Sequence, residues 1–492
     1  MKKNLILALD LGTTGNRALV FDRRQNLLSS EYEEFPQIFP KPGWVEHDPE
    51  KIWQSTRGIL KRTFRRIASS RIAAIGITNQ RETVLLWDKK TGRPLHNAIV
   101  WQCRRSAPAC EALKKKGLGP AIHRKTGLVL DAYFSATKLT WLLDHVPGAR
   151  RKAEKGKVLA GTIDSWIVWK LSGGDSHVTD TSNASRTMLC NLKTLAWDDS
   201  LCRLFRVPKK ILPRIVPSSG RAAVTTKDLG GIPITGIVGD QQAAAFAQGC
   251  FGYGVIKNTY GTGLFLLENT GGKPRFSKNL LTTVAWSVDN LQNTDYAVEG
   301  SVFIGGAALQ WLRDGLKLFS SAKETAKIAQ EIPSNEGVYF VPALVGLGAP
   351  YWDPHARGTI LGLTRGSTRA HLVRAALESI AYQTRDILEV MKRDTGQVFK
   401  VLRVDGGASA NNFLMQFQAN ILGIPVQRPK ILETTALGAA GLAGLGVGLW
   451  KNKEEFNRLR KVDKVFYPKA TALYQASYIR WKEAVTRASH WA

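Results

Sequence analysis

The sequence NLILALDLGTTGNRALVF, residues 4–21, has two apolar runs separated by a turn rich in glycine and threonine. Short apolar runs on either side of a glycine turn are typical of two β-strands joined as a hairpin. Asp10 stands near the end of the first run, and Arg17 stands near the start of the second. The stretch therefore predicts a hairpin whose tip offers a carboxylate, hydroxyl groups and backbone N–H groups.

The same device recurs in the second half of the chain. KNTYGTGLFLLEN, residues 257–269, again places a glycine turn between two apolar runs. A chain of 492 residues is also too long for one ordinary hydrophobic core. Two copies of one unit predict a duplicated α/β domain with a nucleotide cleft between the copies. We place the boundary near residue 250, with domains at 1–249 and 250–492.

The segments around the two hairpins alternate between strand and helix patterns, which predicts an α/β fold. The further strands expected are residues 72–77, 84–87, 233–240 and the start of 401–422, and the helices are 49–67, 241–249, the end of 401–422, and 434–449. The last of these helices is built from small residues. It either approaches another backbone closely or is ordinary tight core packing.

Composition indicates a folded globular chain, with 44% apolar and 22% charged residues. The apolar run at residues 5–9 is too short for a signal peptide, and residues 436–450 are too few to span a bilayer. The five cysteines are scattered and form no metal-binding pattern. We therefore expect reduced, mostly structural thiols in a cytoplasmic protein without a membrane span.

The net charge of +29 raises the question of nucleic acid as a partner. The basic clusters are short, and no motif that reads nucleic-acid bases accompanies them. We therefore expect no nucleic-acid partner. A positive field can also raise the encounter rate with anionic nucleotides, and the reason for the charge stays open.

Three glycine turns are candidate phosphate or nucleotide contacts. In the first, Thr13 and Thr14 offer hydroxyl groups and Asp10 a carboxylate for Mg²⁺, although such turns also close ordinary hairpins. The second turn offers Thr262 as a hydroxyl donor. The third, VDGGASANN at residues 404–412, provides a flat backbone surface for adenosine. None is a P-loop, because the Gly-Lys-Ser/Thr sequence that opens a helix is absent.

Longer stretches of this sequence resemble the FGGY family of carbohydrate kinases, and in particular its members that phosphorylate glycerol. The stretches are TNQRET (78–83), IVWQCRR (99–105), NASRTM (183–188), GDQQAA (239–244), GLGAPYWDP (346–354) and RVDGGASANNFLMQFQ (403–418), with family signatures starting at Tyr133 and Gly358. The resemblance implies two ribonuclease-H-like domains, as in actin, hexokinase and Hsp70, with the nucleotide and substrate cleft between them.

The resemblance also implies a polyol site. The positions that hold glycerol in such kinases match Arg81, Glu82, Tyr133, Asp240 and Gln241, and the aromatic positions that flank it match Trp101 and Phe265. Taken from the residues alone, a selective polyol pocket needs paired donors and acceptors and an apolar wall. By their spacing alone, Arg81 and Glu82 also fit a solvated charge pair.

Asp240 is the candidate general base. A carboxylate can orient a hydroxyl group and accept its proton while the bond to phosphorus forms. The resemblance implies this role, and with Asp10 it implies a Mg²⁺ site. From the sequence, Asp240 also fits the N-cap of the helix that follows it.

For the nucleotide, the resemblance implies contacts from Thr13, Thr14, Gly15, Arg17, Thr262, Gly306, Gln310, Gly407 and Asn411. Position 15 departs from the bacterial pattern, which commonly has serine, so a hydroxyl contact becomes a backbone contact. Residues 224–234 also lack the Gly-Gly-Thr-Arg loop that binds fructose 1,6-bisphosphate in some relatives, which puts that feedback in doubt.

The function expected is phosphorylation of glycerol by ATP to sn-glycerol 3-phosphate, with Mg²⁺ and in a homodimer or homotetramer, as the resemblance implies. One alternative is another kinase of the family that acts on erythritol, a pentulose or a hexonic acid. A second alternative is a non-enzymatic, actin-like ATP switch that binds a partner.

Overall fold

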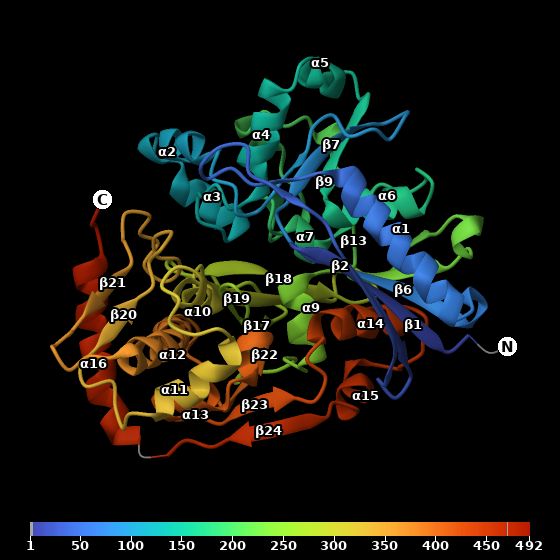
Figure 1. Ribbon diagram of the computed structural model, residues 1–492. Coiled ribbons are helices and arrows are strands. Elements are labelled where there is room, and N and C mark those ends of the chain that lie inside the picture. Colours follow the sequence, from blue (N-terminus) through green and yellow to red (C-terminus); the bar gives the residue numbers. More distant parts are fainter. Residues whose placement is uncertain (1–2, 470) are drawn as a thin grey trace.

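The computed structural model describes residues 3–469 and 471–492 of the chain. Figure 1 shows two lobes, one built mainly from the first half of the chain and the other mainly from the second half. Each lobe is organised around its own large β-sheet. The fold is therefore the duplicated α/β arrangement that the two hairpins predicted.

The N-terminal sheet has the strand order β14-β15-β6-β1-β2-β3. β1 pairs with β2 and β2 with β3 in antiparallel fashion, and β6 and β15 continue the sheet on the other side of β1, parallel to it. The strands are β1 (Leu5–Leu11), β2 (Gly15–Asp22), β3 (Leu27–Glu34), β6 (Ile72–Asn79), β14 (Ser219–Val224) and β15 (Pro233–Gly239). β1 is buried along its whole length, as expected for an apolar strand in the middle of a sheet.

The C-terminal sheet repeats this arrangement. Its order is β18-β19-β17-β16-β22-β23-β24, in which β16, β17 and β19 are antiparallel and β22 and β23 are parallel to β16. The strands are β16 (Val255–Tyr260), β17 (Leu264–Gly271), β18 (Leu281–Ser287), β19 (Thr294–Val302), β22 (Val401–Asp405), β23 (Val426–Pro429) and β24 (Val462–Phe466). The run β19-β17-β16-β22-β23 thus matches β3-β2-β1-β6-β15, which confirms the ribonuclease-H-like duplication.

Helices and smaller sheets cover these two sheets (Figure 1). The helices are α1 (Pro49–Arg66), α2 (Ala107–Lys115), α3 (Gly119–Thr126), α4 (Ser135–His145), α5 (Ala149–Glu154), α6 (Ile163–Leu171), α7 (Thr181–Ala184), α8 (Asp199–Leu204), α9 (Asp240–Ala247), α10 (Gly306–Asp314), α11 (Thr325–Gln330), α12 (Arg369–Thr395), α13 (Asn412–Leu422), α14 (Thr434–Gly446), α15 (Lys453–Arg458) and α16 (Thr471–Ala488). The remaining strands are β4 (Gln37–Ile38), β5 (Glu46–His47), β7 (Val84–Asp88), β8 (Ala98–Ile99), β9 (Val158–Thr162), β10 (Val178–Asp180), β11 (Cys190–Asn191), β12 (Ala196–Trp197), β13 (Arg214–Val216), β20 (Tyr339–Val341) and β21 (Thr359–Leu361).

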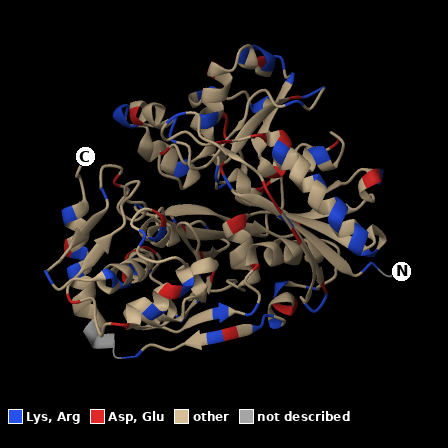
Figure 2. Ribbon diagram, viewed as in Figure 1, with Lys and Arg blue, Asp and Glu red and all other residues tan. Residues whose placement is uncertain are grey.

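Helix α1 illustrates how the sequence sets these elements. Asp48 accepts a hydrogen bond from the backbone N–H of Glu50 and caps the helix, and Pro49 occupies the first turn. Ile52 and Ile59 are buried on one face. Figure 2 shows lysine and arginine along the outer face, where Arg62 pairs with Glu31 and Glu33. The positive charge of this face is therefore partly neutralised by β3.

Helix α14 comes from the second half of the chain but contacts β1, β6 and β15 of the N-terminal sheet, and also α9. Its small residues allow this close approach. A Cβ atom at Gly438 would lie 1.8 Å from the backbone oxygen of Ala243 in α9, and one at Gly76 would lie 2.2 Å from that of Ala439. Of the two interpretations of this helix, the structure therefore supports close approach to another backbone.

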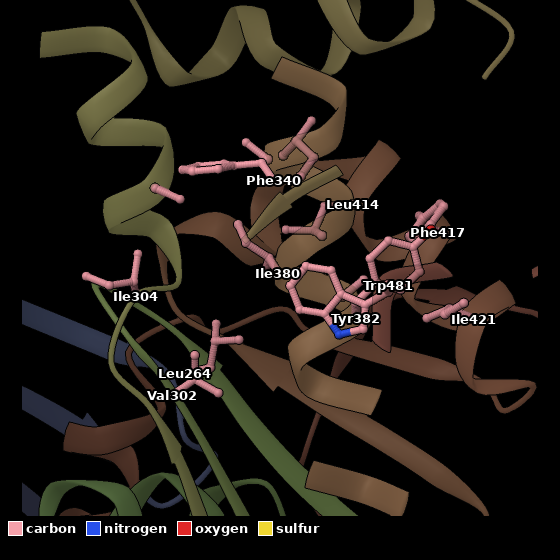
Figure 3. Packing of buried hydrophobic residues seen from close by; sticks show 14 of the residues in the cluster. Leu264, Val302, Ile304, Phe340, Ile380, Tyr382, Leu414, Phe417, Ile421 and Trp481 are labelled. Carbon is pink, nitrogen blue, oxygen red and sulfur yellow. The ribbon is translucent and has the colours of Figure 1, made fainter. Parts of the chain in front are cut away.

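The hydrophobic core of the C-terminal lobe lies between its sheet and helices α10, α12, α13 and α16. Figure 3 shows part of it, in which the ring of Tyr382 stacks on that of Trp481 at a centroid distance of 5.3 Å. A separate cluster fills the region around α9 and α14 between the two sheets. All five cysteines are buried and unpaired. Among residues 3–469 and 471–492, no helix combines the length and the apolar character needed to cross a bilayer.

Candidate active site

The predicted site lies where the parallel strands of the N-terminal sheet end. β1 ends at Leu11, β6 at Asn79 and β15 at Gly239, and these strands are neighbours in the sheet. Asp10 therefore lies beside Thr78 in the register, and Asp240 directly follows β15. The carboxyl ends of parallel strands are a common position for ligand sites in α/β proteins.

Arg81 and Glu82 follow β6 in a tight turn. The N–H of Thr83 donates to the carbonyl oxygen of Arg81 at 2.7 Å, which leaves Glu82 at a φ of 60°. Arg81 is 3% exposed and Glu82 is 1% exposed. The interpretation of this dipeptide as a solvated charge pair is therefore wrong, because the turn directs both side chains into the protein.

The two residues belong to a buried network of charges. Arg81 donates to both oxygens of Glu299, at 2.5 and 3.0 Å, and its Nε lies 3.2 Å from Oδ1 of Asp240. Arg186 donates to Glu82 at 2.5 Å and to Glu299 at 3.0 Å. Glu299 comes from β19, so the network joins the two lobes.

Asp240 is the first residue of α9, and the N-cap is Gly239. The N-cap therefore lies one residue before the position that the sequence indicated. Oδ1 of Asp240 nevertheless accepts the N–H of Gln241 at 2.7 Å. The side chain is 29% exposed, so a ligand can reach it. Desolvation raises the pKa of Asp240, and the positive charges of Arg81 and Lys257 oppose the rise.

Three aromatic rings lie close together near Arg81 and Thr13. The ring centroid of Trp101 lies 5.7 Å from that of Tyr133 and 6.2 Å from that of Phe265. Phe265 belongs to β17 of the C-terminal lobe, and its ring lies 5.9 Å from the guanidinium carbon of Arg81. Nε1 of Trp101 donates to the hydroxyl group of Thr13 at 3.0 Å. The rings therefore form an apolar surface to which both lobes contribute.

Lys257 in β16 is a further charged residue of this region. Its Nζ donates to Oε1 of Gln241 at 2.5 Å, and the side chain is fully buried. Burial lowers the pKa of Lys257, while the charges of Asp405 and Asp240 raise it. Lys257 thus brings a positive charge from the C-terminal lobe close to the end of the N-terminal sheet.

Asp10 is the second carboxylate of the site. Burial raises its pKa to about 7, Arg17 opposes the rise, and the negative charges of Asp240 and Glu433 add to it. Nη1 of Arg17 lies 3.6 Å from Asp10 and 3.8 Å from Glu433. Two carboxylates whose charges repel each other fit a divalent cation, and Mg²⁺ commonly takes one or two carboxylates together with phosphate oxygens.

The described part of the chain contains no cluster of three or more histidine, cysteine, aspartate or glutamate side chains at metal-binding spacing. Asp10 and Asp240 therefore fit a cation that takes its other ligands from water or from a bound phosphate. They do not fit a closed structural metal site.

The second glycine turn, at residues 261–263, packs against the start of α10. The carbonyl oxygen of Thr262 accepts from the N–H groups of Gly305 and Ala307 at 2.8 and 3.1 Å, and Gly306 donates to Gly261 at 2.9 Å. These bonds orient the turn and leave the side chain of Thr262 exposed. Gln310 is exposed one turn further along α10.

The first turn carries Thr14 exposed at its tip and Gly15 buried. A Cβ atom at Gly15 would lie 2.7 Å from the carbonyl oxygen of Glu33 and 2.7 Å from the ring of Tyr32. The side chain of Tyr32 therefore occupies the space that a serine at position 15 would need. This explains the departure from the bacterial pattern.

The third turn lies after β22. Gly406 has a φ of 83°, and a Cβ atom there would lie 2.6 Å from the carbonyl oxygen of Tyr260, whereas Gly407 faces open space. Asn411 caps α13 by accepting the N–H of Leu414 at 3.0 Å, and it donates to the hydroxyl group of Thr325. Its amide already has partners in the fold, which the sequence did not indicate.

Arg186, Lys257 and Glu299 were not predicted as site residues. Arg186 and Lys257 lie inside stretches that were noted, NASRTM and KNTYGTG. Each is a charged residue among apolar or small neighbours, which is the available signal of a buried and paired charge. Glu299 lies between Val298 and Gly300 in a strand and gives the same signal.

Known proteins match this chain along nearly its whole length. Residues 5–247 match the N-terminal domain of the FGGY family of carbohydrate kinases, and residues 256–447 match its C-terminal domain. "Glycerol kinase 2" of Thermotoga maritima is 58% identical over 492 residues, which cover 99% of each chain. A glycerol kinase of Carboxydothermus hydrogenoformans is 56% identical over 100% of this chain and 99% of its own.

Solved structures agree with this relationship. The crystal structure of Plasmodium falciparum glycerol kinase with ADP superposes with a TM-score of 0.92 at 37% identity, and covers 99% of this chain and 98% of its own. A gluconate kinase from Lactobacillus acidophilus has a TM-score of 0.89 at 26% identity, with 98% of each chain covered. Two matched domains and full-length relatives lead to one conclusion: the chain belongs to the FGGY family of carbohydrate kinases.

Proposed function

We propose that this chain transfers the γ-phosphoryl group of ATP to a terminal hydroxyl group of glycerol, which gives sn-glycerol 3-phosphate and ADP. Full-length relatives named glycerol kinase support the substrate. The observation that carries the mechanism is the position of Asp240, which is a partly exposed carboxylate at the start of α9, beside Arg81 and an aromatic wall.

The substrate pocket combines polar groups on one side with aromatic rings on the other. We assign the hydroxyl contacts to Arg81, Glu82, Tyr133, Asp240 and Gln241. Trp101 and Phe265 face the carbon edge. The rings exclude water from that edge. Buried polar groups that are left unpaired cost binding free energy, so a ligand with mismatched hydroxyl groups binds weakly.

Asp240 acts as the general base. It accepts a hydrogen bond from the reacting hydroxyl group, orients the oxygen toward the γ-phosphorus, and takes the proton as the new O–P bond forms. The raised pKa of Asp240 makes it a better proton acceptor than an exposed aspartate. Arg81, whose Nε lies 3.2 Å away, keeps enough of the carboxylate ionised for this role.

The nucleotide takes contacts from both lobes. We assign its phosphates to Thr13, Thr14, Gly15, Arg17 and Thr262, and its adenosine to Gly306, Gln310, Gly407 and Asn411. Asp10 and Asp240 would hold Mg²⁺, which neutralises developing charge on the phosphates when bound. The ordered backbone of the Thr262 turn supports its assignment, because N–H groups fixed by the fold need little reorganisation on binding.

Two lobes serve this reaction by excluding water. A kinase that admits water to its γ-phosphate hydrolyses ATP, and closure of the lobes over both substrates prevents this. We propose the division at 249 and 250, with the glycerol site and first phosphate turn in the N-terminal domain. The second phosphate turn and the adenosine site then belong to the C-terminal domain.

Other substrates of the family are the main alternative. The gluconate kinase of similar structure is named for an anionic sugar acid, which needs a cation that is free to pair with it. Here Arg81 and Arg186 are already paired with Glu82, Glu299 and Asp240. This pairing favours a neutral polyol over a hexonate.

A coupled assay for ADP release tests the proposal. Glycerol, erythritol, xylulose, ribulose and gluconate are offered in turn with ATP and Mg²⁺, and a reaction without acceptor measures ATP hydrolysis. We expect the highest kcat/KM with glycerol and little ADP without an acceptor. ADP release that does not depend on any acceptor would instead favour the non-enzymatic or ATPase alternative.

We further propose a cytoplasmic homodimer or homotetramer. The five cysteines support the compartment, since they are buried and unpaired as expected for a reducing environment. Sedimentation measurements of the purified protein test the oligomeric state.

A further inference from the structure

Glu299 is a charged residue of the C-terminal lobe that contacts two arginines beside the proposed glycerol site. Its carboxylate is fully buried and accepts four hydrogen bonds. Two come from Arg81 at 2.5 and 3.0 Å, one from Arg186 at 3.0 Å, and one from the hydroxyl group of Ser301 at 2.9 Å. No part of this carboxylate is left for a ligand, so Glu299 can act only through its partners.

Arg186 links the same carboxylate to Glu82. Its Nε donates to Oε1 of Glu82 at 2.5 Å while Nη2 donates to Glu299. The guanidinium carbon lies 5.4 Å from the ring centroid of Tyr133, so the cation also contacts the pocket's phenol. Arg186 is fully buried. A continuous chain of contacts therefore runs from Glu82 through Arg186, Glu299 and Arg81 to Asp240.

The pairing fixes which atoms of Arg81 remain for a substrate. Nη1 donates to Glu299 and to Oε1 of Gln242, and Nη2 donates once to Glu299. Two donors of Arg81 remain. One N–H of Nη2 has no acceptor among residues 3–469 and 471–492, and the Nε–H faces Asp240. A guanidinium group is planar, so a two-pronged contact on one edge sets the direction of the other edge.

Two arginines share the carboxylates of this network. Arg81 contacts Glu299 and Asp240. Arg186 contacts Glu82 and Glu299. Removal of the Glu299 charge leaves Glu82 and Asp240 as the remaining carboxylates of the network for these two arginines. An unpaired buried charge is costly, so its former partners turn to the remaining carboxylates.

We propose that Glu299, together with Arg186, is a positioning residue that holds Arg81 and Glu82 in the arrangement that recognises glycerol, so that the C-terminal lobe completes a pocket built mainly on the N-terminal lobe. The inference rests on the proposed function and adds to it. Glycerol recognition then depends on how the lobes are docked, because the group that aligns Arg81 belongs to the opposite lobe.

The test compares the steady-state kinetics of E299Q with those of the unchanged enzyme. Glutamine keeps the shape, but it removes the charge and replaces one acceptor oxygen with an NH₂ donor, so the two-pronged contact with Arg81 is lost. We expect the KM for glycerol to rise by about 10²-fold, as for a misplaced binding group, and the KM for ATP to stay unchanged.

E268Q is the matched control. Glu268 is also a fully buried glutamate in the same sheet, on the neighbouring strand β17, and its carboxylate bonds Thr395 rather than the network. E268Q should keep the KM for glycerol of the unchanged enzyme. A glycerol-dependent rise in the unfolding temperature should be seen with E268Q and lost with E299Q.

A folded E299Q with the original KM for glycerol would overturn the proposal. Should E299Q not fold, E299D and R186K decide the question. R186K keeps the charge but loses the two-pronged geometry, so it should raise the KM for glycerol and leave the KM for ATP unchanged. An unaltered KM for glycerol in both variants would overturn the proposal. The unchanged enzyme reports separately on the proposed function, since its failure to phosphorylate glycerol would reject the substrate.

Discussion

Oδ1 of Asp240 lies 3.2 Å from Nε of Arg81, at the point where β15 passes into α9. Burial favours the neutral form of the Asp240 carboxyl group, and the positive charge of Arg81 opposes this by favouring the carboxylate. The contact also leaves the carboxylate exposed enough to meet a substrate. In the proposed mechanism, substrate binding by Arg81 and proton transfer to Asp240 are therefore coupled at one ion pair.

Replacement of Asp240 tests its role as the base. D240N should lower kcat by about 10²-fold to 10⁴-fold, because an amide can orient the hydroxyl group but cannot accept its proton. ADP binding, measured by calorimetry without glycerol, should change little. D199N is the control, since Asp199 also begins a helix but is exposed and pairs with Lys209. A D240N enzyme with near-normal turnover would reject the assignment.

Asp10 should make stability depend on pH. Its pKa is about 7 in the folded protein and close to 3.8 when unfolded, so the folded state binds the extra proton between these values. The free energy of unfolding therefore falls as pH rises from about 4 to about 7. D10N removes this cost, so it should raise the unfolding temperature at pH 8 more than at pH 5.

The same variant should lose activity, because Asp10 is also a proposed Mg²⁺ ligand. Thermal unfolding at several pH values, with and without Mg²⁺ and ADP, separates the two effects. The unchanged protein should gain stability from Mg²⁺ with ADP, and D10N should gain less. An unfolding temperature of D10N that follows the unchanged protein at every pH would contradict the raised pKa.

Substitution in α14 tests the close approach of the backbones. G438A would place a Cβ atom 1.8 Å from the carbonyl oxygen of Ala243, and both helices are packed against β6 and β15 of the N-terminal sheet. We expect a loss of at least about 2 kcal/mol in the free energy of unfolding, measured in urea. G119A is the control, because no atom lies within 4 Å of the added Cβ there.

Position 15 offers a test of the first phosphate turn. G15S should weaken ATP binding and destabilise the β2–β3 pair, since its Cβ would lie 2.7 Å from the carbonyl oxygen of Glu33. Y32A alone removes only the contact with the tyrosine ring. If G15S combined with Y32A restores ATP binding but only part of the stability, the ring blocks the hydroxyl group and the backbone accounts for the rest. Equal ATP affinity in G15S and the unchanged enzyme would contradict this account.

Sequence patterns predicted the strands beside Asp10 and Asp240, because Asp10 stands near the end of one apolar run and Asp240 follows another, and such runs favour buried strands. The repeated glycine turn predicted the duplication, because each copy lies between two apolar runs. The surroundings of Arg81 could not be predicted. The adjacent charges of Arg81 and Glu82 favoured a solvated pair at the surface, whereas the partner of Arg81, Glu299, lies 218 positions away in the chain.

Lys257 shows the same limit. A lysine in a strand is ordinarily assigned to an exposed edge, and only the tertiary structure shows that Gln241 and the neighbouring carboxylates surround it. Asn411 shows the converse, since a residue predicted to contact nucleotide also caps a helix. Local patterns thus find strands and turns, but the pairing of distant charges depends on how the lobes meet.

The position of α14 has a consequence for synthesis on the ribosome. The sheet formed by residues 5–239 is covered on one face by a helix that is translated only after residue 434. Until then Gly76 and Gly236 lie on an apolar surface without its cover. One apolar face of the first lobe therefore stays exposed during synthesis until nearly all of the second lobe has been translated. Chaperone binding to the nascent chain is expected to matter most in this interval.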